Sequence, residues 1–180
     1  PVGPPAPQSK HYPILLLAFG NDPDADAVLL VLDGRRDLLP AEQELYLQLK
    51  KLDRPLLVAV NKIDSPRGED AAGDFFRLGA ERLYLVSAEH KRNIEELADG
   101  LASVLPVSAP ASGDEPAEAL RVALIGRINV GKSSLANRLC GEDRLIVSRA
   151  PGTTRDSADI LLRRDRKLFC LVDTAGLRKL

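Results

Sequence analysis

Residues 122–133 read VALIGRINVGKS, an apolar run followed by a glycine-rich loop. The loop Gly126–Ser133 matches the pattern G-x4-G-K-[S/T], in which glycines let main-chain N–H groups surround a phosphate chain. A helix-like segment continues to Leu139, and its positive dipole end would add to this anion site. We expect Lys132 to reach the terminal phosphates and Ser133 to bind Mg2+. The stretch therefore predicts a strand, a phosphate-binding loop and a helix, built around a nucleoside triphosphate.

Two later segments match the parts that manage such a nucleotide. Pro151–Asp156 (PGTTRD) lies where a loop with a Mg2+-binding threonine is expected, and Thr154 is our candidate for that hydroxyl. An apolar run then ends in Asp173 and is followed by Gly176. The Asp173 carboxylate suits a contact to Mg2+-bound water, and the Gly176 N–H suits a contact that senses the γ-phosphate. The candidate catalytic residues are Lys132, Thr154 and Gly176. The candidate phosphate and Mg2+ ligands are Gly126, Arg127, Ile128, Asn129, Val130, Gly131, Lys132, Ser133, Ser134, Thr153, Thr154, Asp173, Thr174, Ala175 and Gly176.

The base is expected to be read earlier in the chain. The apolar run Leu56–Val60 ends in Asn61-Lys62-Ile63-Asp64, an N-K-x-D motif. A carboxylate at Asp64 accepts hydrogen bonds from the N1–H and 2-amino groups of guanine, and such a site rejects bases that lack these donors. Asn61 and the stem of Lys62 would brace the base. Alone, the motif also fits a polar turn after a strand, but beside a phosphate-binding loop it predicts guanine selection.

A second strand-like run, Leu83–Val86, ends in Ser87 and Ala88. We expect a main-chain N–H of these two residues to meet the carbonyl oxygen of guanine. The candidate base-binding residues are therefore Asn61, Lys62, Asp64, Ser87 and Ala88.

These motifs resemble the Der (EngA) family of bacterial GTPases, which have two tandem G domains. GRINVGKSSLANRL, IVSRAPGTTRD and LVDTAGLRK, within Arg121–Leu180, resemble the second G domain. ADAVLLVLDGR, LLVAVNKID and LYLVSAEH, within Ala25–Leu105, resemble the back half of the first. The chain departs from the family at Ile128, where proline is usual, and at Lys91–Asn93, where glycines are common. Neither departure removes a ligand, so both bear on loop geometry alone.

The resemblance implies a GTP-binding protein of the cytoplasm that hydrolyses GTP to GDP and phosphate and takes part in assembly of the large ribosomal subunit. Leu177 occupies the position where many small GTPases carry a water-orienting glutamine. Asn129 matches the asparagine that holds K+ in potassium-activated relatives of Der, so K+ between Asn129 and carbonyls near Ser148 and Ala150 would replace an arginine finger. A side chain that braces the loop is the alternative for Asn129.

The motifs run in an unusual order, with N-K-x-D and S-A before the phosphate-binding loop. One explanation is a slice of a tandem GTPase, and the DTAGLRK wording with the chain end at Leu180 favours it. A circularly permuted ribosome-assembly GTPase is the other explanation. A module that binds nucleotide without hydrolysing it is a third hypothesis.

The fold class expected is α/β, a mostly parallel sheet with helices on both faces, as in the P-loop NTPase G domain. Strands are predicted at Ala27–Leu32, Leu56–Val60, Leu83–Val86, Arg121–Ile125, Ala158–Leu162 and Leu168–Val172, and helices at Pro40–Leu52, Asp70–Leu78, Ile94–Leu105 and Lys132–Cys140. Residues 158–173 should form a hairpin with one antiparallel strand. We expect a proline-rich disordered segment (1–24), a base-reading half-domain (25–105), a linker (106–117) and a phosphate-binding half-domain (118–180). The halves could close into one domain or stay apart.

Composition adds few constraints. The net charge is −1, so no basic footprint indicates nucleic acid binding. The two cysteines, Cys140 and Cys170, show no metal or disulfide spacing. No apolar run approaches the roughly 18 residues of a membrane span, so no membrane partner is expected.

Overall fold

The computed structural model describes residues 25–105, 120–140, 159–164 and 167–173, and within these ranges six strands form one sheet in the order β3-β2-β1-β4-β6-β5. The strands are β1 (Ala27–Asp33), β2 (Leu56–Asn61), β3 (Leu83–Leu85), β4 (Leu120–Ile125), β5 (Asp159–Arg164) and β6 (Lys167–Asp173). The helices are α2 (Pro40–Leu49), α3 (Pro66–Ala71), α4 (Gly73–Phe76), α5 (Ile94–Val104) and α6 (Lys132–Cys140). Neighbouring strands are parallel except β5, which pairs antiparallel with β6 at one edge. The expected fold class is confirmed.

The two halves of the chain meet in the middle of this sheet. Strand β1 pairs in parallel with β4, with Leu29 opposite Leu124. Asp26 closes the start of the pair, because its N–H donates to the Arg121 carbonyl and its carboxylate accepts from the Arg121 N–H, both over 2.7 Å. Of the two arrangements that the sequence left open, the structure therefore has the closed one, with a single sheet.

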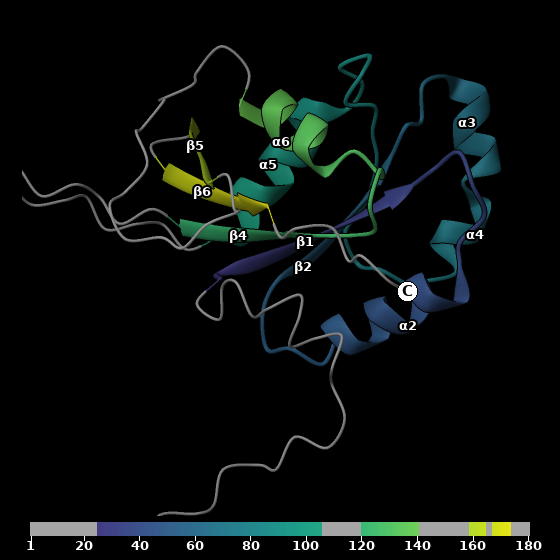
Figure 1. Ribbon diagram of the computed structural model, residues 1–180, viewed down its shortest axis with the longest axis horizontal. Coiled ribbons are helices and arrows are strands. Elements are labelled where there is room, and N and C mark those ends of the chain that lie inside the picture. The colour runs from purple at the N-terminus through teal and green to yellow at the C-terminus, as the bar shows by residue number, and fades with distance from the viewer. Residues whose placement is uncertain (1–24, 106–119, 141–158, 165–166, 174–180) are drawn as a thin grey trace, which may run out of the picture.

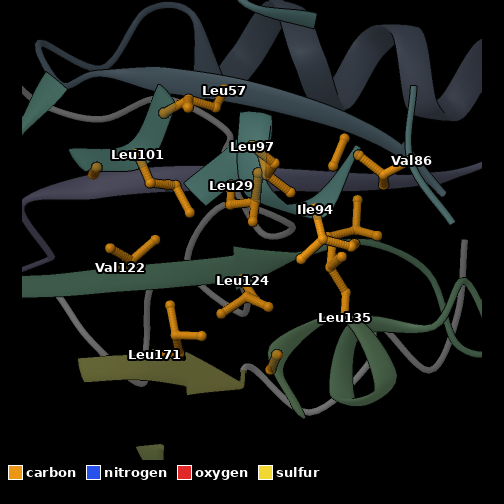
Figure 2. Close-up of a cluster of buried hydrophobic side chains, with 14 of the residues drawn as sticks. Leu29, Leu57, Val86, Ile94, Leu97, Leu101, Val122, Leu124, Leu135 and Leu171 are labelled. Carbon is orange, nitrogen blue, oxygen red and sulfur yellow. The ribbon is translucent and has the colours of Figure 1, made fainter. Parts of the chain in front are cut away.

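Helices cover both faces of the sheet (Figure 1). Alternate residues of β1 point to opposite faces, and all but the last are buried, as expected for a strand in the interior of a parallel sheet. One face packs against α5 and α6, where Leu97 and Leu135 join Leu29 and Leu124 in one apolar cluster (Figure 2). The other face packs against α2 and α4 through Leu45, Tyr46, Leu49 and Phe75. The first cluster draws on both halves of the chain, so neither half completes it alone.

The predicted strands and helices are present with small shifts at their ends, apart from one helix. The expected helix Asp70–Leu78 is instead two short helices, α3 and α4, which are separated at Ala72. Ala72 has φ −77° and ψ 7°, and bonds of the i→i−3 type join Ala72 to Glu69 and Phe75 to Ala72. Gly73 follows Ala72 directly, and glycine has a low helix propensity, which favours a break at this point. Helix α3 starts early because Pro66 is preorganised for a first helical turn.

None of the described helices is both long and apolar enough to cross a bilayer. The predicted segments 1–24 and 106–117 lie outside the described residues.

Candidate nucleotide-binding site

A cleft of about 1000 Å³ lies at the carboxyl end of the parallel strands, where open α/β sheets bind their ligands. Both halves of the chain line it. The base-reading half contributes Arg35, Asn61, Lys62, Ser87, Ala88, Glu89, Lys91, Ile94 and Glu95, and the phosphate-binding half contributes Gly131, Ser134, Asn137 and Arg138. Two groups of predicted site residues that lie far apart in the sequence therefore share one cavity.

The phosphate-binding loop connects β4 to α6 and has a tightly curled backbone. Gly126 and Gly131 have φ of 156° and 94°, and Asn129 between them has φ 63°. A Cβ on Gly126 would collide with the Val31 carbonyl of the neighbouring strand β1, so this close approach requires glycine. Lys132 begins α6, is buried, and donates from Nζ to the carbonyls of Gly126 and Arg127 over 3.1 Å each. The lysine thus lies inside the curl of the loop.

Asn61 connects the base-reading loop to the phosphate-binding loop. Its side chain is 2% exposed, and Nδ2 donates to the Val130 carbonyl over 2.9 Å. Its Oδ1 accepts from the Ala88 N–H over 3.0 Å. A Cβ on Gly131 would collide with the same Nδ2. One buried amide thus fixes the relative positions of three loops.

Lys62 makes a second connection between the same loops. Its Nζ donates to Asp33 Oδ2 over 2.7 Å and to the Asn129 carbonyl over 2.6 Å. Lys62 itself has φ 71°, a left-handed conformation that is uncommon for lysine. This backbone geometry carries the side chain across to the phosphate-binding loop. Its stem lines the cleft, where it was expected to brace the base.

Asp64 is bonded to two residues that line the cleft, Arg35 and Ser87, and both of its carboxylate oxygens are engaged. Oδ2 accepts from the Arg35 guanidinium and Oδ1 from the Ser87 hydroxyl, each over 2.7 Å. The hydrogen bonds from Arg35 and Ser87 hold the pKa of Asp64 below its ordinary value, and burial opposes them weakly. The carboxylate is therefore ionised, and its two bonds orient it. Glu89 lines the cleft as well, and His90 Nε2 lies 3.9 Å from Asp64 Oδ1.

The two N–H groups that were expected to meet guanine have partners within the protein. The Ser87 N–H donates to the Arg92 carbonyl over 3.1 Å, and the Ala88 N–H donates to Asn61. Arg138 of α6 reaches the same loop and donates from Nε to the Ala88 carbonyl over 2.7 Å. These contacts hold the loop after β3 against the helix that begins at the phosphate-binding loop.

The glycine-poor continuation at Lys91–Asn93 adopts the backbone that glycine would favour. Lys91 and Asn93 have φ of 59° and 53°. Asn93 tolerates this left-handed conformation and donates from Nδ2 to the Leu85 carbonyl over 2.8 Å, immediately before α5 begins. Non-glycine residues therefore adopt positive φ at two of the three positions where the family pattern commonly has glycine.

Several predicted site residues fall in segments that the structure does not describe. Thr153, Thr154, Thr174, Ala175 and Gly176 lie outside the described residues, as do Ser148, Ala150 and Leu177. Asp173 is the last residue of β6, opposite Leu124 in the register with β4, so its backbone lies beside the strand that leads into the phosphate-binding loop.

Sequence reasoning assigned no role to Arg35, Asp33 or Arg138. Asp33 ends strand β1, and Arg35 follows two residues later. Asp33 pairs in register with Asn61 at the end of β2. A signal was present, because polar residues that end adjacent parallel strands converge at one edge of the sheet. Arg138 lies on α6 within the family-like string GRINVGKSSLANRL, but outside the G-x4-G-K-[S/T] pattern to which the phosphate chemistry was assigned.

Comparison with known proteins supports this geometry. The family described as 50S ribosome-binding GTPase matches residues 121–180. GTPase Der of Geotalea uraniireducens is 45% identical over 156 residues, which is 87% of this chain and 35% of that protein. Over most of its length the chain is similar to GTPase Der. A second example, GTPase Der of Xanthomonas axonopodis pv. citri, is 43% identical over 158 residues, 87% of this chain and 34% of that protein.

The match to Der is partial in length. The chain spans about a third of the curated Der proteins. Among solved structures, YjeQ from Thermotoga maritima superimposes with a TM-score of 0.55 at 21% identity, over 85% of this chain and 48% of that one. At this identity the superposition supports the fold alone. The expected relationship to Der is confirmed by the sequence matches.

Proposed function

We propose that this chain binds guanine nucleotide in the cleft between its two halves and hydrolyses GTP to GDP and phosphate. The observation that carries the proposal is the Asn61 amide, which bonds to the phosphate-binding loop at Val130 and to the base-side loop at Ala88. This bridge supports the proposal because it holds the base-reading loop and the phosphate-binding loop beside each other on one cleft. The names of the Der relatives and of the ribosome-binding GTPase family support the same activity.

The base end of the cleft has the chemistry for guanine. Asp64 is ionised and is bonded to two lining residues, Arg35 and Ser87, so its oxygens could accept hydrogen bonds from the N1–H and 2-amino groups of a base in the cleft. The stem of Lys62 and the buried Asn61 flank the same space. We propose that Asp64 selects the base and that Ser87 keeps its carboxylate in orientation. Ala88 would reach the guanine carbonyl oxygen by sharing its N–H with Asn61.

The phosphate end fits an anion with a bound Mg2+. The curled backbone at Gly126–Gly131 admits no side chain at its two glycines, and Lys132 supplies a positive charge inside the curl. Ser133 is exposed at the start of α6. We propose Ser133, Thr154 and Asp173 as the residues that hold Mg2+, directly or through water. When bound, Mg2+ offsets charge that develops on the phosphate oxygens.

Hydrolysis would depend on positioning and on neutralising charge, because Leu177 cannot orient water. Lys132 would leave the Gly126 and Arg127 carbonyls to contact the terminal phosphates, and the N–H of Gly176 would contact the γ-phosphate. We propose that the Asn129 side chain would help to hold K+, which would supply positive charge near the phosphates when bound. Asn129 is exposed on the loop, and within the described residues its side chain makes no hydrogen bond, so its amide oxygen is available to an ion.

We propose further that residues 25–105 and 118–180 act as the base-reading and phosphate-binding halves of this site, joined by residues 106–117. By its relationship to Der and the ribosome-binding GTPase family, its partner would be the large ribosomal subunit and its compartment the cytoplasm. A nucleotide-binding protein without turnover is the competing function, because the switch residues that complete the site lie outside the described residues.

The proposal is tested by titrating the purified chain with GDP, GTP and ATP in the presence of Mg2+, and by measuring phosphate release from GTP. We expect binding of GDP and GTP, with ATP excluded. Lys132→Ala should weaken both guanine nucleotides, whereas Lys50→Ala, at an exposed position just after α2, should change neither. Binding without phosphate release would select the competing function, and absence of guanine nucleotide binding would refute the proposal.

A further inference from the structure

Arg35 lines the cleft, and it is the last residue of the family-like string ADAVLLVLDGR, in which no role was assigned to it. Strand β1 ends at Asp33, and Arg35 follows after Gly34. The Arg35 N–H donates to Asp33 Oδ1 over 3.1 Å. This turn directs Arg35 toward the loop that follows β2, and the residue lines the cleft. Its side chain is 55% exposed, so little packing holds the guanidinium in place.

The Arg35 guanidinium contacts the one carboxylate that would read the base. Its terminal nitrogen NH2 donates to Asp64 Oδ2 over 2.7 Å, and the same nitrogen lies 3.6 Å from Glu89 Oε2. The Asp64 carboxylate raises the pKa of Arg35 above its ordinary value, first through this hydrogen bond. Arg35 therefore stays charged while it holds Asp64.

A guanidinium and the edge of guanine make the same kind of contact with a carboxylate. Each is planar and presents neighbouring N–H donors that suit the two oxygens. Ser87 takes one acceptor position of Oδ1 and Arg35 takes one of Oδ2. Guanine would share Oδ1 with the small Ser87 hydroxyl, and at Oδ2 it would compete with the larger, charged guanidinium of Arg35.

We propose that Arg35 occupies the base-reading carboxylate of Asp64 in the nucleotide-free protein and that guanine binds by displacing it. Arg35 is then a specificity-site residue that lowers guanine affinity and keeps Asp64 oriented when the cleft is empty. Glu89 gives the displaced side chain an alternative partner, because its carboxylate is 71% exposed and already close to the same nitrogen. This inference rests on the proposed guanine nucleotide site.

The test compares GDP affinity of Arg35→Ala with that of the unchanged chain and of Arg36→Ala. Arg36 is the matched control, since it is also exposed and cationic but does not line the cleft; it lines a second cavity beside the phosphate-binding loop. An exposed ion pair contributes little free energy, so its loss should change the affinity only modestly. We expect Arg35→Ala to bind GDP about two- to fivefold more tightly at low salt. Arg36→Ala should leave GDP binding unchanged or weaken it. The gain should shrink in high salt, which screens the ion pair that is lost.

A second comparison locates the effect at Asp64. In an Asp64→Asn background, xanthosine diphosphate replaces GDP as the probe, because its 2-oxo group suits an amide donor. Adding Arg35→Ala there should change affinity no more than adding Arg36→Ala does. Equal or weaker GDP binding by Arg35→Ala, or the same gain in the Asp64→Asn background, would overturn the inference while the proposed function stands. If neither the unchanged chain nor Arg35→Ala binds GDP, the proposed function fails and the inference fails with it.

Discussion

The side-chain amide of Asn61 donates to the main-chain carbonyl of Val130 over 2.9 Å, although 69 residues separate them. The same side chain accepts from the Ala88 N–H, so its two polar atoms serve two different loops. Both bonds are buried, which means that water cannot take the place of a missing partner. The geometry of the cleft therefore depends on one residue at the end of a central strand.

Replacing Asn61 with alanine should affect stability and binding together. The Val130 carbonyl and the Ala88 N–H would each lose a buried partner, and each unsatisfied group costs about 1–3 kcal/mol. We expect the free energy of unfolding to fall by about 2 kcal/mol or more, as measured by urea denaturation. Gln43→Ala, an amide removed from the exposed face of α2, is the control and should be nearly neutral. Equal stability of the two variants would show that the bridge contributes nothing.

Gly131→Ala should disrupt the same bridge from the other side. The new Cβ would collide with Asn61 Nδ2, and the φ of 94° is strained for alanine. We expect loss of GDP binding and a lower melting temperature. Gly73→Ala is the matched control, because no atom lies within 4 Å of the position of its Cβ. The Gly73→Ala substitution should raise the free energy of unfolding slightly, by about 0.4–1 kcal/mol. A Gly131→Ala variant with normal GDP affinity would show that the close approach of Asn61 to this glycine does not matter for binding.

Removing Arg35 should also move the titration of Asp64. The bond from Arg35 is the largest cause of its lowered pKa, so Arg35→Ala should raise that pKa toward the ordinary value of about 4. A carboxyl group with a depressed pKa in the folded state contributes stability that is present above its unfolded pKa and is lost as pH falls through the folded pKa. The variant should therefore lose the part of this stability that the Arg35 bond supplies, and its Asp64 should become protonated at a higher pH. The carboxyl carbon shift of Asp64, followed by NMR against pH, measures the change, and an unmoved midpoint would exclude Arg35 as its cause.

GTP turnover should be faster in KCl than in NaCl at equal ionic strength if Asn129 helps to hold K+. Asn129→Gly is the sharper variant, since glycine retains the φ of 63° that alanine would strain. It should abolish the difference between the salts and leave GDP binding largely intact, because Lys62 holds the main-chain carbonyl and not the side chain. Phosphate release in the two salts is the measurement. Equal rates for the unchanged chain would rule out the K+ site.

Much of the architecture could be predicted from local pattern. The run before Gly126 and the run before Asn61 are apolar, unbroken and short, which is typical of buried parallel strands, and both are strands of the sheet. The break between α3 and α4 could not be predicted, because the apolar residues around Phe75 continue a helical spacing across Ala72. Closure of the halves could not be predicted either, because pairing of β1 with β4 depends on tertiary contacts that no local pattern records.

The candidate site divides in the same way. Asp64 and Lys132 belong to motifs whose spacing reflects their chemistry, so the sequence identified them. Arg35 is one charged residue in a turn after a strand, and its bond to Asp64 spans 29 residues. Only the pairing of β1 with β2, with Asp33 opposite Asn61, brings the two turns together. A residue that acts through the register of a sheet leaves little trace in the sequence around it.

The pairing of β1 with β4 also has a kinetic consequence. The bond between Asp26 and Arg121, at the start of this pair, joins residues 95 positions apart. Closing so long a loop costs chain entropy before the stabilising contacts between the two strands have formed, so we expect slow folding. Until that step, β1 and β4 each present an unpaired edge that another copy of the chain can match equally well. At high concentration the same register would form between molecules, and reciprocal exchange would give a dimer with two composite clefts.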